Sequence, residues 1–195
     1  MIKSFDFYFD FISPYSFLAH KEMRKIENKT KIRIRYKPIL LGGLHNLHGI
    51  KAPAFIPAKA RHMIRDCKLI AERNNVKFKF NSYFPIKSLN LMRGVLVAEE
   101  DNIKDYYIDN IFNTVWQDGL NMNDETLIQK VLKNLNVNPK TFSLRSNSSS
   151  IKDSLRKKTN EAFEKGIFGA PTFYINSKIF WGQDRLEYAI TEYLK

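Results

Sequence analysis

The sequence predicts an α/β fold whose sheet is built from both ends of the chain, with a block of helices between them. Three observations predict it. Residues 1–40 follow a strand, helix, strand pattern, residues 41–159 follow mainly helical periodicity, and residues 160–195 return to strands and a last helix. We therefore divide the chain into a discontinuous sheet domain, residues 1–40 and 160–195, and an inserted helical domain, residues 41–159.

The first strand is predicted over residues 3–11, where the side chains alternate with a period of two. The side that we expect to be buried carries only phenylalanines: Phe5, Phe7, Phe9 and Phe11. Ser13-Pro14 follows and predicts a helix start, because serine can cap a helix and proline suits its first turn. A second strand is expected over residues 32–37, where apolar and basic residues alternate until Pro38.

The middle of the chain predicts a series of helices, because apolar residues recur there at spacings of three and four. The expected ranges are 57–74, 89–100, 102–118 and 124–134. Asparagines and prolines mark the breaks: Asn74-Asn75, Pro85, residues 121–123 and Asn138-Pro139. A polar turn over residues 146–150 precedes a further helix over residues 151–165, which Gly166 stops.

The last part of the chain predicts a hairpin and a helix. Two short strands, residues 172–175 and 179–181, flank a tight turn at Asn176-Ser177-Lys178. Asp184 is then expected to cap a last helix that runs through Leu194.

Composition predicts a folded protein outside the membrane. Hydrophobic residues make up 44% of the chain, with 15 Phe and 9 Tyr, which is enough for a core. No apolar stretch approaches the ~20 residues that span a bilayer. The first residues lack the charged and then apolar pattern of a signal peptide, so we expect a cytoplasmic protein.

The formal net charge is +12, from 32 Lys and Arg against 20 Asp and Glu. The basic residues are dispersed, and the sequence carries no zinc finger, aromatic-basic RNA motif or basic region with heptads. We therefore do not expect nucleic-acid binding. An anionic ligand fits the charge equally well.

Cys67 is the only cysteine of the chain. A single cysteine excludes an intramolecular disulfide and any Cys-x-x-Cys redox centre. Because it lies in a stretch with helical periodicity, Cys67 is predicted to be a half-buried helix residue.

Three short segments carry the candidate chemistry, and the first is residues 11–16 with Ser13. A strand ends and a helix begins there, so free backbone N–H groups and the helix dipole favour an anion beside Ser13. The hydroxyl can donate to a thiolate, an oxyanion or a carboxylate. The alternative is that Ser13 is only a helix cap.

The second segment is residues 166–172, where Pro171 stands between a glycine-rich turn and a buried strand. Proline removes a donor from the ladder of hydrogen bonds. A cis Ala170-Pro171 bond is one solution, and it leaves the backbone of Ala170 free to pair with a ligand. An ordinary trans proline at the start of a strand is the alternative.

The third segment is residues 181–185, where another strand gives way to a helix. Asp184 can hold an ammonium group, while the first amides of the helix and Arg185 can hold a carboxylate. The alternative is a capping aspartate beside a surface arginine.

Together the three segments resemble the 2-hydroxychromene-2-carboxylate isomerase family, which is grouped with kappa-class glutathione transferases in the DsbA-like branch of thioredoxin folds. The resemblance is carried by Ser13-Pro14-Tyr15-Ser16 and by residues 168–173 and 180–186. Further matches fall in the expected order at residues 40–43, 57–61, 84–86 and at Trp116, so the resemblance spans nearly the whole chain. It implies a thioredoxin-like fold with an inserted all-helical domain.

The resemblance also implies a cofactor, glutathione, and a set of residues around it. Glutathione would lie against Ala170 and Pro171, and its sulfur would point at Ser13. Its γ-glutamyl end would lie near Gln183, Asp184 and Arg185, and Lys59 matches a family lysine that can attract a carboxylate: the residues implied are thus Ser13, Lys59, Ala170, Pro171, Gln183, Asp184 and Arg185.

The activity implied is isomerisation of a small, anionic aromatic substrate. In the family the glutathione thiolate adds to the conjugated system, a bond rotates, and the thiol leaves, so glutathione is not consumed. A hydrogen bond from Ser13 and the helix N-terminus would lower the thiol pKa. The family's habit also implies a homodimer.

The sequence departs from the family where an asparagine usually contacts glutathione, because Ile50 stands in that position. Isoleucine cannot replace the hydrogen bonds of an amide. His45 and His48 lie nearby, and a role in the pocket of the second substrate suits them better than a metal site, since no Cys or acidic partner is near.

Three functions therefore stay open. The first is a glutathione-dependent isomerase, and the second is a kappa-like glutathione transferase that acts on small electrophiles. The third is a non-catalytic module that binds glutathione or a peptide. A thiol-disulfide oxidoreductase is not expected, because Ser13 and Ser16 occupy the places of the two cysteines that its chemistry needs.

Overall fold

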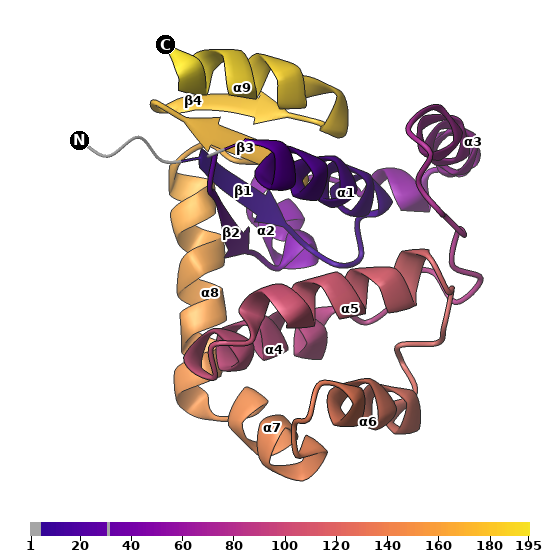
Figure 1. Cartoon of the computed structure of the whole chain (residues 1–195), viewed down its shortest axis with the longest axis vertical. Helices are drawn as coiled ribbons and strands as arrows, with labels where there is room; N and C mark the ends of the chain where they lie inside the picture. Colours follow the sequence, from indigo (N-terminus) through magenta and orange to yellow (C-terminus); the bar gives the residue numbers. More distant parts are fainter. Residues whose placement is uncertain (1–4, 31) are drawn as a thin grey trace.

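The computed structural model describes residues 5–30 and 32–195, and its centre is a four-stranded mixed sheet in the order β2-β1-β3-β4 (Figure 1). The strands are β1 (Phe5–Phe9), β2 (Ile34–Pro38), β3 (Thr172–Ile175) and β4 (Lys178–Trp181). β1 pairs with β2 in parallel and with β3 antiparallel, so the two ends of the chain meet in one sheet, as predicted. Residues 3 and 4 of the predicted first strand lie outside the described residues.

Both faces of β1 are buried, which corrects the expectation of a single aromatic face. Phe7 and Phe9 pack on one face, with Tyr36 and Phe173 beside them. On the opposite face Tyr8 belongs to a smaller cluster that includes residues of α2 (Leu41–His48) and α8 (Ser149–Glu164). Helices cover both sides of the sheet, so an alternating pattern cannot separate inside from outside here.

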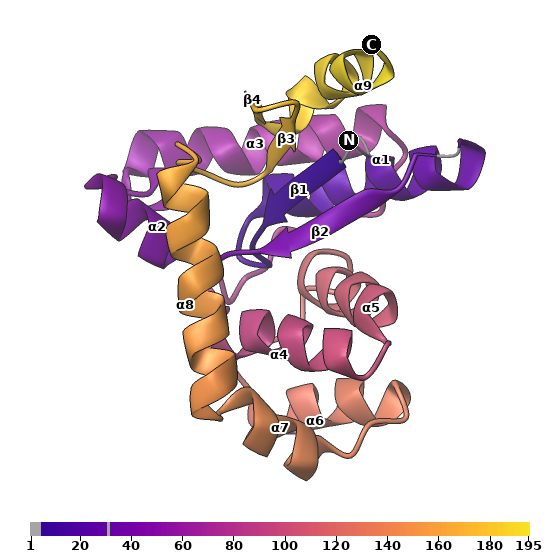
Figure 2. The ribbon, with the colours of Figure 1, turned by 90° about the vertical axis from the view of Figure 1, so that its left-hand side faces the viewer.

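The remaining helices are α1 (Pro14–Lys29), α3 (Pro57–Arg73), α4 (Leu89–Glu100), α5 (Lys104–Trp116), α6 (Glu125–Asn134), α7 (Pro139–Ser146) and α9 (Leu186–Leu194), with short 3-10 turns at Pro53–Phe55 and Gln183–Arg185. α4 and α5 lie next to the sheet, while α6 and α7 lie farther from it. In the turned view α8 runs from α7 past α4 to the sheet (Figure 2). The predicted boundary between residues 159 and 160 falls inside α8, so the division into domains stays a prediction.

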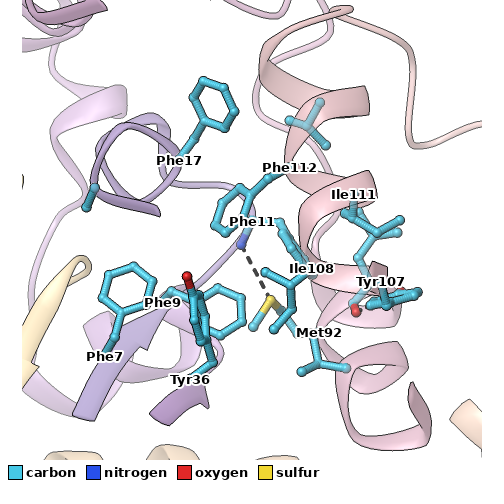
Figure 3. Packing of buried hydrophobic residues seen from close by; sticks show 14 of the residues in the cluster. Phe7, Phe9, Phe11, Phe17, Tyr36, Met92, Tyr107, Ile108, Ile111 and Phe112 are labelled. Atoms are coloured by element: carbon cyan, nitrogen blue, oxygen red, sulfur yellow. Dashed lines mark hydrogen bonds between the residues drawn. The ribbon is translucent and has the colours of Figure 1, made fainter. Parts of the chain in front are cut away.

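One hydrophobic cluster joins the sheet to α4 and α5, which lie between β2 and β3 in the sequence. Phe9 and Phe11 pack against Phe112 of α5, with ring centroids 5.6 and 4.8 Å apart (Figure 3). The Phe11 N–H donates to Met92 Sδ at 3.4 Å, and Trp116 Nε1 donates to the Phe11 carbonyl at 2.7 Å. The segment that leads to Ser13 is therefore fixed by α4 and α5.

Two helices, α2 and α7, were not predicted. Gly42 and Gly43 weaken the helical pattern of α2, but Leu41 N–H at its start is bound by Asp10 and Gly49 ends it in the left-handed conformation. In α7 the Asn138-Pro139 pair, interpreted as a break, is itself a helix start. The Asn138 side chain accepts from Lys140 N–H and Thr141 N–H.

The other predicted helices are present, with ends within three residues of the expected positions. The predicted turn at Asn176 and Ser177 is also present, because both residues have positive φ and join β3 to β4. Within the described part of the chain, none of the helices is both long and apolar enough to cross a membrane.

Candidate active site

Ser13 lies at the point where the first strand leads into α1. It caps the helix, because its Oγ accepts from Ser16 N–H at 3.1 Å. The same hydroxyl donates to the Ala170 carbonyl at 3.0 Å, and the residue is 5% exposed. Ser13 is therefore a helix cap and also the contact between two motifs that are 157 residues apart in the sequence.

The Ala170-Pro171 peptide bond is cis, which is one of the two alternatives considered for this segment. The Pro171 carbonyl accepts from Gly182 N–H at 3.0 Å, so the third motif begins directly beside the second. Two hydrogen bonds thus connect the three segments, one from Ser13 to Ala170 and one from Gly182 to Pro171. The structure brings together the three segments that the sequence singled out.

Gln183, Asp184 and Arg185 form a 3-10 turn that packs against α1. The expectation that Asp184 caps the last helix is wrong. Asp184 lies inside the turn, and α9 begins without a side-chain cap. The Asp184 and Arg185 side chains are 57% and 48% exposed, and Asp184 Oδ2 lies 3.4 Å from Arg185 Nη2. Because they are open to solvent, these charged groups are accessible to a ligand.

Lys59 lies in the first turn of α3, where it is exposed. Among the described residues it has no hydrogen bond or ion pair with the other predicted site residues. The same helix contacts the Ser13 motif through Tyr15, whose hydroxyl donates to Asp66 Oδ2 at 2.7 Å. Burial and the neighbouring Asp66 raise the pKa of Tyr15, so its hydroxyl stays a donor.

Asp10 is a site residue that the sequence did not reveal. Its fully buried carboxylate accepts from Ile12 N–H at 3.0 Å and from Leu41 N–H at 2.8 Å, and its carbonyl accepts from Ser13 N–H at 3.0 Å. Burial raises the pKa of Asp10 to about 6, although these N–H groups and the Ser88 hydroxyl act to lower it. Asp10 therefore holds the loop that carries Ser13.

The model of the DSBA-like thioredoxin domain family matches residues 4–193. The chain belongs to this family. Among curated relatives, a 2-hydroxychromene-2-carboxylate isomerase of Sphingobium xenophagum is 26% identical over 190 residues, covering 96% of each chain.

A second relative of this DSBA-like thioredoxin domain is glutathione S-transferase kappa 1 of Caenorhabditis elegans. It is 27% identical over 195 residues, covering 92% of this chain and 86% of the relative. The solved structure of a 2-hydroxychromene-2-carboxylate isomerase superposes with a TM-score of 0.88 at 25% identity, covering 96% of this chain and 92% of the other. The thioredoxin-like fold with a helical insertion, predicted from the sequence, is thus confirmed.

The two histidines of α2, His45 and His48, differ in their contacts. His48 Nε2 lies 2.9 Å from the Ile167 carbonyl, and its ring packs on Phe163 with centroids 4.5 Å apart. His48 therefore ties the end of α2 to the segment before Pro171. Burial and the neighbouring His48 lower the pKa of His45. A role of either histidine in a second-substrate pocket stays a prediction.

Cys67 lies on α3 and is fully buried, which corrects the expectation of a half-buried residue. Burial and the nearby Asp66 raise the pKa of its thiol to about 12. A thiol with these properties is almost entirely protonated at neutral pH, and only the thiolate is nucleophilic. Cys67 thus has the surroundings of a structural residue in this DSBA-like domain.

We expect Cys67 in the folded protein to react with Ellman's reagent at least about a hundredfold more slowly than an unhindered thiol, because its thiolate is scarce and buried. In guanidinium chloride it should react at once. Leu69→Cys is the matched control, since Leu69 lies two residues along α3 and is 65% exposed. Similar native rates for the two thiols would contradict the assignment.

Proposed function

We propose that this chain is a glutathione-dependent isomerase similar to 2-hydroxychromene-2-carboxylate isomerase. The observation that carries the proposal is the position of the Ser13 hydroxyl, at the N-terminus of α1 and 3.0 Å from the Ala170 carbonyl. Curated relatives with the isomerase name, at 26–28% identity over nearly the whole chain, support the same reaction. The substrate class proposed is a small aromatic carboxylate.

The residues present fit glutathione. The tripeptide carries an α-ammonium group, two carboxylates and a thiol. The exposed Asp184 and Arg185 offer one group of each charge, and Lys59 on α3 offers a second cation. Ala170 and Pro171, beside Ser13, would line the cysteinyl part.

Ser13 is the proposed catalytic residue. Its Oγ already accepts from Ser16 N–H, so its one proton is available to a ligand once the O–H turns from the Ala170 carbonyl towards it. A donor at the positive end of the α1 dipole would stabilise a thiolate and lower the thiol pKa. Bound glutathione would supply the thiolate that adds reversibly to the conjugated substrate.

Calorimetry with reduced glutathione tests the proposal. We expect the wild type to bind, and the absence of measurable binding would sink the proposed function. In Ser13→Ala the bound thiol should have a higher pKa, seen as a weaker ultraviolet thiolate signal at pH 7. An unchanged signal would refute the role of Ser13.

Ser16→Ala is the matched control. Ser16 lies in the same motif, and its Oγ is buried without a hydrogen-bond partner among the described residues. Removing that hydroxyl should therefore leave the thiol pKa unchanged. Ser13→Ala also removes a helix cap, at a cost of about 1 kcal/mol, so a melting curve should accompany each titration.

A kappa-like glutathione transferase is the second candidate. Kappa relatives match over more than nine-tenths of this chain. Ile50, which stands where the resemblance implies an asparagine in contact with glutathione, favours the non-catalytic alternative instead. Assays with hydroxychromene carboxylate and with an electrophilic nitroaromatic distinguish the two activities. If glutathione binds but neither substrate is turned over, the non-catalytic alternative holds. A cytoplasmic homodimer is part of the proposal, and light scattering tests the dimer.

A further inference from the structure

A pocket of about 690 Å³ opens between α2, α4 and α8, and none of the proposed glutathione residues lines it. Its volume lies within the range of small-molecule sites. Much of its wall is apolar and comes from Leu40, Leu47, Leu89 and Leu155. Leu155 is buried, whereas Leu47 and Leu89 are 47% and 37% exposed. The pocket therefore offers a ligand a hydrophobic surface that is open to solvent.

The charged residues of this pocket are mostly basic. Arg93, Lys152 and Arg156 face a single acid, Asp153. Arg156 Nη2 is paired with Asp153 Oδ1 at 2.5 Å. Among residues 5–30 and 32–195, Arg93 and Lys152 have no acidic partner within 4.0 Å. The pocket thus retains two positive charges that no carboxylate of the described chain balances.

Arg93 has unused hydrogen-bond donors. Its Nη1 donates to two neutral amides, Asn90 Oδ1 at 3.2 Å and Asn147 Oδ1 at 3.4 Å. Its Nε is buried without a partner among the described residues, and its Nη2 makes no hydrogen bond within them either. Nη2 is therefore the donor of the guanidinium that remains for a carboxylate in the pocket. The asparagines orient the guanidinium but leave its charge unbalanced.

We propose that this pocket binds a small organic monocarboxylate with an apolar body, separately from glutathione. The carboxylate would accept from Arg93, with Lys152 as a second cation, and the apolar body would cover the leucines. A hydrogen-bond donor without a partner, next to an apolar wall, fits an apolar monocarboxylate better than inorganic phosphate. Phosphate would leave the leucines exposed to water. A neutral aromatic compound would leave Arg93 without an acceptor.

The structure also links this pocket to the candidate active site. Leu40 of the wall precedes Leu41, whose N–H donates to the Asp10 carboxylate. Leu89 of the wall follows Ser88, whose hydroxyl lowers the pKa of Asp10. Leu40 N–H donates to Thr159 Oγ1 of α8 at 3.0 Å, which joins two walls of the pocket. A ligand between α2, α4 and α8 would therefore brace the elements that hold the Ser13 loop.

The experiment is a calorimetric titration of the full chain with 2-naphthoate, with naphthalene-2-methanol as the neutral counterpart. Both are run with and without saturating reduced glutathione. We expect 2-naphthoate to bind in either condition and the alcohol to bind about tenfold or more weakly. Arg93→Gln should weaken 2-naphthoate binding by a similar factor. Lys157→Gln, which removes a 78% exposed cation of α8 outside the pocket, should leave it unchanged.

A second variant tests the same pocket without changing Arg93. Leu47→Glu places a carboxylate at the exposed edge of the same pocket and should also weaken binding. Methyl NMR locates the ligand, because Leu47, Leu89 and Leu155 should shift while the methyl of Ala170 does not. No binding, equal binding by the alcohol, or full affinity in both pocket variants would overturn the proposal. None of these readouts depends on whether glutathione binds.

Discussion

Gly94→Ala should lower the free energy of unfolding by about 2–4 kcal/mol. Gly94 lies in α4, and a Cβ built there would stand 2.1 Å from Tyr107 Oη and 2.7 Å from its Cζ. Tyr107 is 2% exposed and its hydroxyl donates to the Leu91 carbonyl at 3.0 Å. The ring therefore cannot retreat without losing that hydrogen bond and disturbing the packing between α4 and α5.

Urea unfolding followed by circular dichroism measures this loss, and Gly42→Ala is its control. Gly42 also lies in a helix, α2, but a Cβ there meets nothing within 4 Å. Alanine is the better helix former, so Gly42→Ala should stabilise the protein by up to about 1 kcal/mol. Opposite signs are thus expected from the same substitution. Tyr107→Phe removes the nearest atom and should restore part of the stability of Gly94→Ala. Equal effects of the two alanines would contradict the steric argument.

Several parts of the fold were predictable because short segments carry strong patterns. The strands β1 and β2 follow from alternation, and the hairpin of β3 and β4 follows from alternation and from the turn at Asn176-Ser177. The α2 helix was not predicted, because its stability depends on tertiary contacts. Its Leu41 N–H is bound by a carboxylate 31 residues earlier in the sequence, which no local pattern reports.

Some residues of the candidate site were likewise predictable from the sequence, and others were not. Ser13 and Pro171 drew attention because a helix start and a proline at a strand entry mark their segments, and the family resemblance added Ala170. The structure joins the two segments. Tyr15 and Asp66 were missed, because a hydrogen bond across 51 residues leaves no periodic signal. Asp10 falls opposite the predicted phenylalanine side of the alternating pattern, and alternation cannot indicate that helices cover both faces. An acid placed three residues before Ser13 was the only local hint.

Asp10 gives the second large effect, which depends on pH. Burial raises its pKa from 3.8 to about 6, so folding favours the protonated form. A group whose pKa is raised by folding contributes stability below its unfolded value, and that contribution is lost as the pH rises through the folded value. A shift of about two units corresponds to about 3 kcal/mol. We therefore expect wild type to lose up to about 3 kcal/mol relative to Asp10→Asn between about pH 4 and pH 7.

Urea unfolding of both proteins across this range gives the difference directly, and asparagine serves as a non-titrating reference of the same shape. Ser88→Ala is a second probe. The Ser88 hydroxyl acts to lower the pKa of Asp10, so its removal should move the loss of stability to higher pH. A difference between wild type and Asp10→Asn that is constant or increases with pH would contradict the assignment.

Ionisation of Asp10 should also strengthen the hydrogen bonds that hold the loop before Ser13. Above about pH 6 the ionised Asp10 carboxylate is the stronger acceptor for Ile12 N–H and Leu41 N–H, which hold the loop before Ser13. The global free energy of unfolding should therefore fall over the pH range in which hydrogen exchange at these two amides slows relative to the rest of the chain. Protection that falls in parallel with global stability would mean that Asp10 only destabilises the fold and does not order the Ser13 loop.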